Sequence, residues 1–166
     1  MSQAVSAQQV IEVLTSRAVS FLENDLGITA ESKHIYLKDV PLISLGHITT
    51  LVSMEGHISA LFVFSYDQAL INDIYKKYTQ GMAIDESERD IYMEECAGEI
   101  TNTVIGNATK DFERQNSLLT FTPPVVLKEA QNLIKKKNTR FYNAEIHTES
   151  GILNIFYIVP KETEGA

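Results

Sequence analysis

Two polar residues on one predicted helix are the strongest candidates for chemistry in this sequence. Glu99 and Asn102 lie in the segment from Glu86 to Glu113, whose apolar residues recur at helical spacing. Residues three apart on a helix are neighbours, separated by about 4.5 Å along its axis. The carboxylate of such a pair can bind a cation, and the carboxamide offers a donor and an acceptor without charge. The pair alone indicates a contact surface and no reaction, because these residue types are mostly solvated anyway.

The rest of the helix divides into two faces. We expect the core-facing stripe to hold Met93, Ala97, Ile100, Val104 and Ala108, with Cys96 at its margin. The polar face then holds Glu95, Gly98, Glu99, Asn102, Gly106, Thr109 and Glu113. Glycine inside a helix costs about 1 kcal/mol relative to alanine, and its bare backbone lets another molecule approach closely. Gly98 and Gly106 therefore mark a contact surface around the pair, whereas Asn107 projects toward the buried edge and is interpreted as a hydrogen-bonded structural residue.

This segment resembles a known family signature. Residues 99–108 read E-I-T-N-T-V-I-G-N-A, which is similar to the E-I-x-N…G-N-A signature of the CheX/CheC chemotaxis phosphatases, the CheC/CheX/FliY family. Residues 121–127, F-T-P-P-V-V-L, resemble that family's L-P-T-V-I segment and follow at the right distance. CheX is the closer relative, because only one active-type motif is present. The corresponding place in the first predicted helix has Glu12 but Thr15 where asparagine is required.

The resemblance implies an activity. Members of the family hydrolyse the aspartyl-phosphate of a CheY-type response regulator. By this resemblance Asn102 would hold the attacking water, Glu99 would dock on the partner's lysine, and Gly98, Gly106 and Asn107 would lie where the partner approaches. The partner would be a phosphorylated CheY-like receiver domain that supplies the Mg²⁺, so this chain would bind no cofactor, and relatives form homodimers by joining sheet edges. The alternative is a non-catalytic response-regulator-binding or adaptor module of the CheC/FliM-like fold; the intact pair favours the enzyme.

The elements expected around this helix predict a single α+β domain over residues 1–166. Helices are expected at Ser6–Glu23, Asp67–Thr79 and Glu86–Glu113, and strands at Lys33–Val40, Gly46–Met54, Ile58–Ser65, Leu118–Leu127, Arg140–His147 and Ile152–Val159. Pro123 and Pro124 should interrupt the fourth strand or place it at an edge. Helix plus three strands thus occurs twice, which suggests a duplication. We expect a CheC-like, six-stranded sheet covered on one side by long helices.

Composition limits the partners. The 166 residues carry a formal net charge of -8, which argues against nucleic acid and against an anionic membrane surface. The four histidines are scattered and Cys96 is the single cysteine, so no metal site is expected. The sequence contains neither a basic signal-peptide start nor a long apolar span, which predicts a cytoplasmic protein.

Overall fold

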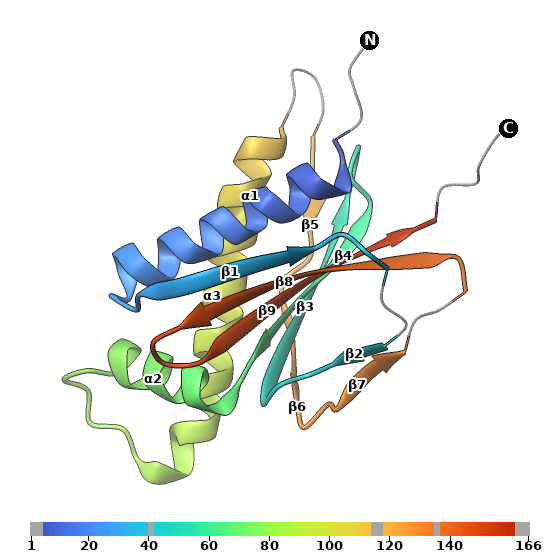
Figure 1. Ribbon diagram of the computed structural model, residues 1–166. Helices are drawn as coiled ribbons and strands as arrows, with labels where there is room; N and C mark the ends of the chain where they lie inside the picture. The colour runs from blue at the N-terminus through green and yellow to red at the C-terminus, as the bar shows by residue number, and fades with distance from the viewer. Residues whose placement is uncertain (1–4, 40–41, 114–117, 135–136, 162–166) are drawn as a thin grey trace, which may run out of the picture.

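The computed structural model describes residues 5–39, 42–113, 118–134 and 137–161. Three helices form: α1 (Ala7–Ser20), which continues into a π-helical turn at Phe21–Asp25, α2 (Gln68–Tyr78) and α3 (Arg89–Phe112). The strands are β1 (Ala30–Tyr36), β2 (Leu42–Ser44), β3 (Ile48–Glu55), β4 (Ala60–Tyr66), β5 (Thr120–Phe121), β6 (Val125–Lys128), β7 (Asn132–Ile134), β8 (Thr139–Thr148) and β9 (Ile152–Pro160). All three expected helices are confirmed (Figure 1). The first strand ends at Tyr36, before its expected end at Val40, a residue that lies outside the described ranges.

Local sequence signals account for where the helices begin. Ser6 caps α1 in a full capping box with Gln9, and the Asp67 carboxylate caps α2 by accepting from the Leu70 amide at 2.8 Å. The segment before α3 departs from expectation, because Glu86–Glu88 is a 3-10 turn and the α-helix starts only at Arg89. Helix ends commonly tighten in this way.

The main sheet has the strand order β1-β8-β9-β4-β3-β5, and β6 also pairs with β3. All its pairings are antiparallel. The expected strand over Leu118–Leu127 is therefore split: β5 pairs near Met54, β6 pairs over Ile48–Leu51, and Pro123 and Pro124 lie between them. The sheet consequently has seven strands rather than the predicted six, although β5 and β6 share one position beside β3. A residue without an N–H group cannot continue the ladder.

Exchanging the two halves of the chain maps the sheet onto itself. The first half contributes α1, β1, β3 and β4, and the second contributes α3, β6, β8 and β9. If β1 is matched with β6, β3 with β8 and β4 with β9, the order β1-β8-β9-β4-β3-β6 reads the same from the opposite edge. This topology is consistent with the duplication of helix plus three strands, and α2 is the connector between the repeats.

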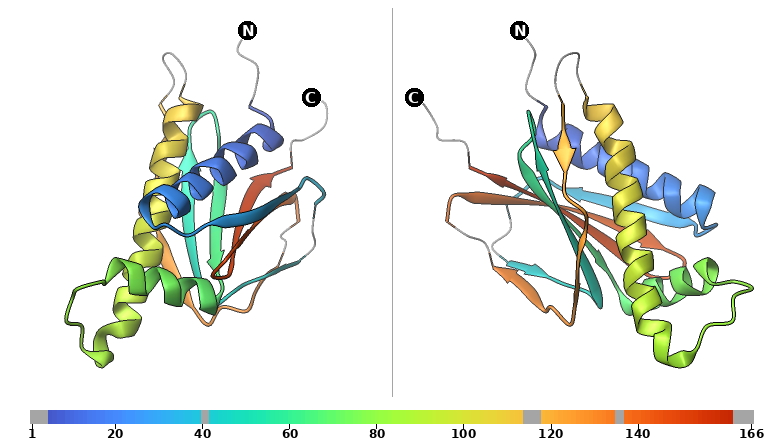
Figure 2. Two further views of the ribbon diagram at one scale, coloured as in Figure 1. Left: turned by 60° about the vertical axis from the view of Figure 1, so that its left-hand side comes forward. Right: turned by 180° about the vertical axis from the view of Figure 1, so that it is seen from behind.

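The helices cover one face of this sheet (Figure 2). The main core lies between them and the sheet and includes Leu14, Phe62, Phe64, Ile100 and Val104, none of which is exposed. On the opposite face, β2 and β7 form a two-stranded sheet that the sequence did not predict. It covers a smaller cluster of Ile43, Val63, Phe141 and Phe156. The inner face of α3 is thus packed into the main core, and its outer face is exposed to solvent.

Candidate functional site

The Glu99–Asn102 pair lies on the exposed side of α3, as the spacing predicts. The residues between the two, Ile100 and Thr101, are fully buried. Neither Glu99 nor Asn102 makes a side-chain hydrogen bond or ion pair with another described residue. An acid and an amide, one helical turn apart, are therefore both available to a partner molecule.

A buried hydroxyl cluster sets the rotation of α3 about its axis. The Thr101 hydroxyl lies 2.6 Å from that of Thr50 on β3 and 2.9 Å from the hydroxyl of Tyr66 on β4. The Tyr66 hydroxyl also donates to the Ala97 carbonyl at 3.4 Å. Burial raises the pKa of Tyr66, so its hydroxyl stays protonated. Buried hydroxyls must find partners, and satisfying Thr101 on the sheet side turns its neighbours Glu99 and Asn102 outward.

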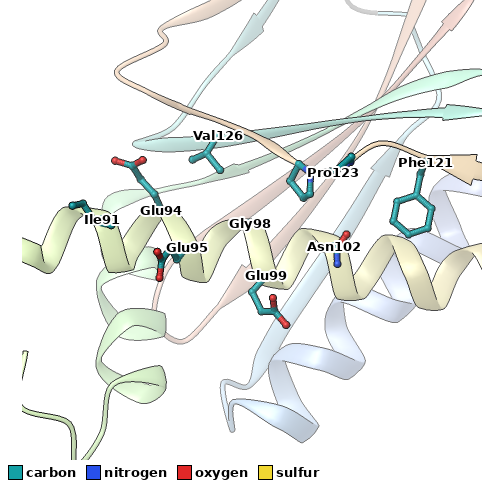
Figure 3. A pocket seen from close by; sticks show the side chains of 10 residues that line it. Ile91, Glu94, Glu95, Gly98, Glu99, Asn102, Phe121, Pro123 and Val126 are labelled. Atoms are coloured by element: carbon teal, nitrogen blue, oxygen red, sulfur yellow. The ribbon is translucent and has the colours of Figure 1, made fainter.

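A groove runs along α3 where β5 and β6 cross beside it (Figure 3). We call this hollow the α3–β6 groove; its volume is about 780 Å³. It is lined by Ile91, Glu94, Glu95, Gly98, Glu99, Asn102, Phe121, Pro123, Pro124 and Val126. Both candidate residues therefore border a concave surface whose far wall is the proline segment. Surface hollows with apolar walls and a few polar groups are the usual form of binding sites.

The two glycines of α3 face this crossing. A Cβ added at Gly98 would lie 3.6 Å from Val126 Cγ2, and one at Gly106 would lie 3.8 Å from Phe121 Cζ. Both distances are ordinary van der Waals contacts, so the protein's own β5–β6 segment does not demand glycine at either position. Gly98 borders the groove beside Glu99, whereas Gly106 is not among the residues that line it. The partner's approach at these glycines stays a prediction, and of the two only Gly98 borders the groove.

One expectation about the polar face of α3 is wrong. Helical spacing predicts Thr109 on the polar face, but the residue is buried and its hydroxyl donates to the Ile105 carbonyl at 2.8 Å. Asn107 is half-buried, in keeping with its expected place at the edge of the stripe, and its structural role stays a prediction. A helix of ten buried residues is covered over a wider arc than the predicted stripe, because it packs against both α1 and β3.

The carboxylates around the groove differ in their partners. Lys128 Nζ on β6 lies 2.8 Å from Glu94 Oε1 and 4.0 Å from Asp90 Oδ2, and the hydrogen bond to Glu94 raises the pKa of Lys128. Glu95 and Glu99 are not part of any ion pair between described residues. The outer face of α3 therefore carries negative charge at Glu95 and Glu99 that no basic residue in the described part of the chain neutralises.

The corresponding place in the first repeat does not form a second site. Glu12 on α1 is exposed, but Thr15 is buried and its hydroxyl donates to the Ile11 carbonyl at 2.6 Å. A side chain held in this way cannot reach a partner. The first repeat thus lacks the exposed pair that the second repeat presents.

The histidines form no metal centre in the described part of the chain. His34 and His147, which seemed scattered in the sequence, meet across β1 and β8 with ring centroids 5.6 Å apart. His147 Nε2 also lies 3.1 Å from Glu145 Oε2. Among the described residues, no three histidine, cysteine, aspartate or glutamate side chains are arranged to hold a metal ion. No helix in the described ranges is both long enough and apolar enough to span a membrane.

Sequence reasoning did not identify the far wall of the groove as part of the site. Phe121, Pro123, Pro124 and Val126 were expected only as an interrupted strand. Their proximity to Glu99 depends on β5 and β6 pairing with β3, which lies some seventy positions earlier in the chain. The resemblance of residues 121–127 to the family's second motif was the one available signal.

The comparisons with known proteins agree with this geometry. The model of the family described as chemotaxis phosphatase CheX matches residues 48–147, more than half of the chain. A CheX crystal structure from Desulfovibrio desulfuricans is similar with a TM-score of 0.73 and 13% identity, over 90% of this chain and 97% of that one. CheX from Vibrio vulnificus gives a TM-score of 0.71 and 16% identity, over 94% and 98%.

A third similar structure contains a partner. It is the CheX-CheY-BeF3-Mg complex from Borrelia burgdorferi, with a TM-score of 0.71 and 16% identity over 92% of this chain and 98% of that one. No curated protein matches the sequence. The structural likenesses, at such low identity, show the fold, and the family model shows the lineage: this chain belongs to the CheX family of chemotaxis phosphatases.

Proposed function

We propose that this protein is a phosphatase that hydrolyses the aspartyl-phosphate of a CheY-type response regulator. The observation that carries the proposal is the exposed Glu99–Asn102 pair, one turn apart on α3 at the rim of the α3–β6 groove. Membership of the CheX family supports the activity, and the solved complex of a similar CheX with CheY supports the partner. A receiver domain is also a cytoplasmic partner, in keeping with the predicted location.

The reaction requires little covalent chemistry from this chain. A water oxygen attacks the phosphorus in line with the bond to the partner's aspartate; that bond breaks, which gives a free carboxylate and inorganic phosphate. Asn102 holds the water through its carboxamide, whose oxygen accepts a hydrogen bond from it. An amide has no charge to repel the phosphoryl oxygens, and positioning a reactant in this way is a large catalytic effect by itself.

Glu99 acts as the docking group. Its carboxylate pairs with a lysine of the receiver and fixes the register, which places Asn102 over the phosphoryl group one turn further along α3. A carboxylate that faced the phosphoryl oxygens directly would be repelled, so Glu99 is not assigned as the base. The partner supplies the Mg²⁺, and this chain contributes no cofactor of its own.

A homodimer through a sheet edge is part of the proposal. The outer edge of β1 pairs with no other strand in the described part of the chain, because β8 occupies only its inner edge. Strand edges with free N–H and C=O groups tend to pair with a second chain. Light scattering during gel filtration should give twice the monomer mass, and a proline introduced at Lys33 should restore the monomer.

The test is a phosphate-release assay against the receiver domains encoded in the same genome. Asn102→Ala should keep receiver binding and lose most of the acceleration, whereas Glu99→Ala should weaken productive docking. Asn132→Ala and Glu12→Ala are matched controls at exposed positions outside α3. Wild-type rates for both test variants on the true partner would overturn the assignment. Binding of a phosphorylated receiver without acceleration by the unmodified protein would establish the non-catalytic adaptor instead.

A further inference from the structure

A second hollow lies between α2 and α3. Its volume is about 280 Å³, and it is lined by Tyr78, Thr79, Met82, Tyr92, Glu95, Cys96 and Glu99. We call it the α2–α3 notch. Glu95 and Glu99 border both this notch and the α3–β6 groove, so they form a ridge between two hollows. In Figure 3 their side chains leave α3 on the side opposite Glu94, which points toward β6.

Within the described ranges, no basic side chain pairs with the ridge. Two carboxylates four residues apart on one helix destabilise it by mutual repulsion. Two basic side chains of neighbouring segments are engaged elsewhere: Lys128 pairs with Glu94, while Arg89 donates to Asn72 and lies 5.3 Å over the ring of Tyr75. No ion pair between described residues includes Glu95 or Glu99. An incoming positive charge would remove this repulsion.

The walls of the notch suit a long basic side chain. Tyr78 and Tyr92 are half-buried and Met82 is 54% exposed, so two rings and a thioether flank the carboxylates. The methylene stem of lysine or arginine packs on such apolar walls while its charged head meets the carboxylates, and cations favour the faces of tyrosine rings. Burial is the main cause that raises the pKa of Tyr78 to about 12, and the charge of Glu99 adds to it, so the phenol hydroxyl stays neutral.

We infer that Glu95 is a second docking group, which, with the walls of the α2–α3 notch, binds a basic side chain of the receiver other than the lysine that Glu99 binds. The inference rests on the proposed function, since it names how the same partner is selected. Glu95 touches no reacting atom and acts by positioning. Receivers with a basic residue at the matching place on their surface are accepted, and receivers with an acidic one are repelled by the unneutralised ridge.

The experiment compares Glu95→Gln, Glu95→Lys and Met82→Ala with the unmodified protein. Glu113→Gln is the matched control, because it makes the same change on an exposed carboxylate at the end of α3. For each protein, KM and kcat for receiver dephosphorylation are measured at low and high salt, and receiver binding is measured separately by calorimetry. Glu95→Gln should raise KM roughly two- to tenfold at low salt with kcat retained, Glu95→Lys should raise it further, and both should flatten the salt dependence. Met82→Ala should raise KM without changing the salt dependence.

Each outcome decides the matter. An unchanged KM in Glu95→Gln, or a loss of kcat at constant KM, overturns the inference and leaves the phosphatase standing. Equal changes in Glu113→Gln also overturn it, because the effect would then be one of net charge. Receiver binding could be salt-dependent and weakened by Glu95→Gln while the unmodified protein releases no phosphate. That result supports the docking role and overturns the phosphatase proposal. If no receiver either binds or is hydrolysed, both proposals are wrong.

Discussion

The hydroxyl oxygens of Thr50 and Thr101 lie 2.6 Å apart, in the buried space between β3 and α3. Each is fully buried, and the Tyr66 hydroxyl completes the cluster. The contact joins the sheet to the same helical turn that presents Glu99 and Asn102 to solvent. The orientation of the exposed residues Glu99 and Asn102 is thus fixed by a hydrogen bond between two buried threonines.

Replacing Thr101 with valine should destabilise the protein by about 1–3 kcal/mol, because the hydroxyls of Thr50 and Tyr66 would lose a buried partner. The shape and the β-branching are retained, so the loss reports the hydrogen bonds. The free energy of unfolding in urea measures it. Thr103→Val, at a half-exposed position of the same helix, is the control, and an equal loss there would contradict the interpretation.

Gly98→Ala should separate stability from function. The added Cβ meets only Val126 at an ordinary distance, and alanine favours a helix by about 1 kcal/mol over glycine, so the melting temperature should rise. The same methyl group narrows the groove beside Glu99, so KM for the receiver should rise. Melting curves and phosphate release, measured on one preparation, test both effects. A variant that is more stable and has an unchanged KM would show that the partner does not approach the helix at Gly98.

The Cys96 thiol should resist alkylation in the folded protein. The side chain is 6% exposed, and burial, with the charge of Glu95, raises its pKa to about 11. Roughly one thiol in a thousand is then ionised at pH 8, and the thiolate is the reactive form. Mass spectrometry after iodoacetamide treatment should show labelling at least tenfold slower than in urea-unfolded protein. Equal rates would contradict the burial of this residue.

The ion pair between Arg17 on α1 and Asp111 on α3 should make the stability of the fold depend on pH in the acidic range. Two nitrogens of Arg17 each lie 2.7 Å from an Asp111 carboxylate oxygen, and this hydrogen bonding lowers the pKa of Asp111 from its usual 3.8. A lowered pKa in the folded state gives stability that is present above pH 3.8 and is lost as the pH falls through the folded-state value. The difference in melting temperature between the unmodified protein and Asp111→Asn should therefore be largest near neutrality. It should shrink as the pH falls below about 4. A difference independent of pH would rule out the ionic contribution.

The elements with strong periodicity were predictable from sequence. The helix around Glu99, the hairpin at Gly56 and the last hairpin all lie where alternation and turn residues placed them. The exposed pair was predictable because helical spacing fixes which side chains share a face. The expected β-strand over Leu118–Leu127 was divided for a reason that was visible in the sequence, namely its two prolines.

Contacts between distant segments were not predictable. The strands Leu42–Ser44 and Asn132–Ile134 are three residues long and exist because they pair with each other across some ninety positions. Thr109 seemed polar by type, yet threonine can satisfy its hydroxyl on the helix backbone and so be buried without penalty. The α2–α3 notch likewise depends on how two helices meet, which periodicity within one helix does not specify.

The prolines between β5 and β6 also decide how far copies of this chain can associate. Because Pro123 and Pro124 have no amide hydrogens, the sheet edge formed by β5 and β6 offers an interrupted row of hydrogen-bond donors. An incoming strand could not pair along the full length of this edge. The edge at β1 contains no proline, although its pairing with β8 shifts register between Ala30 and Ser32, and one such edge per molecule would be used up when two copies met. If copies of this chain pair through β1, the assembly should therefore be finite, because growth into a fibre would need a second edge that accepts a strand.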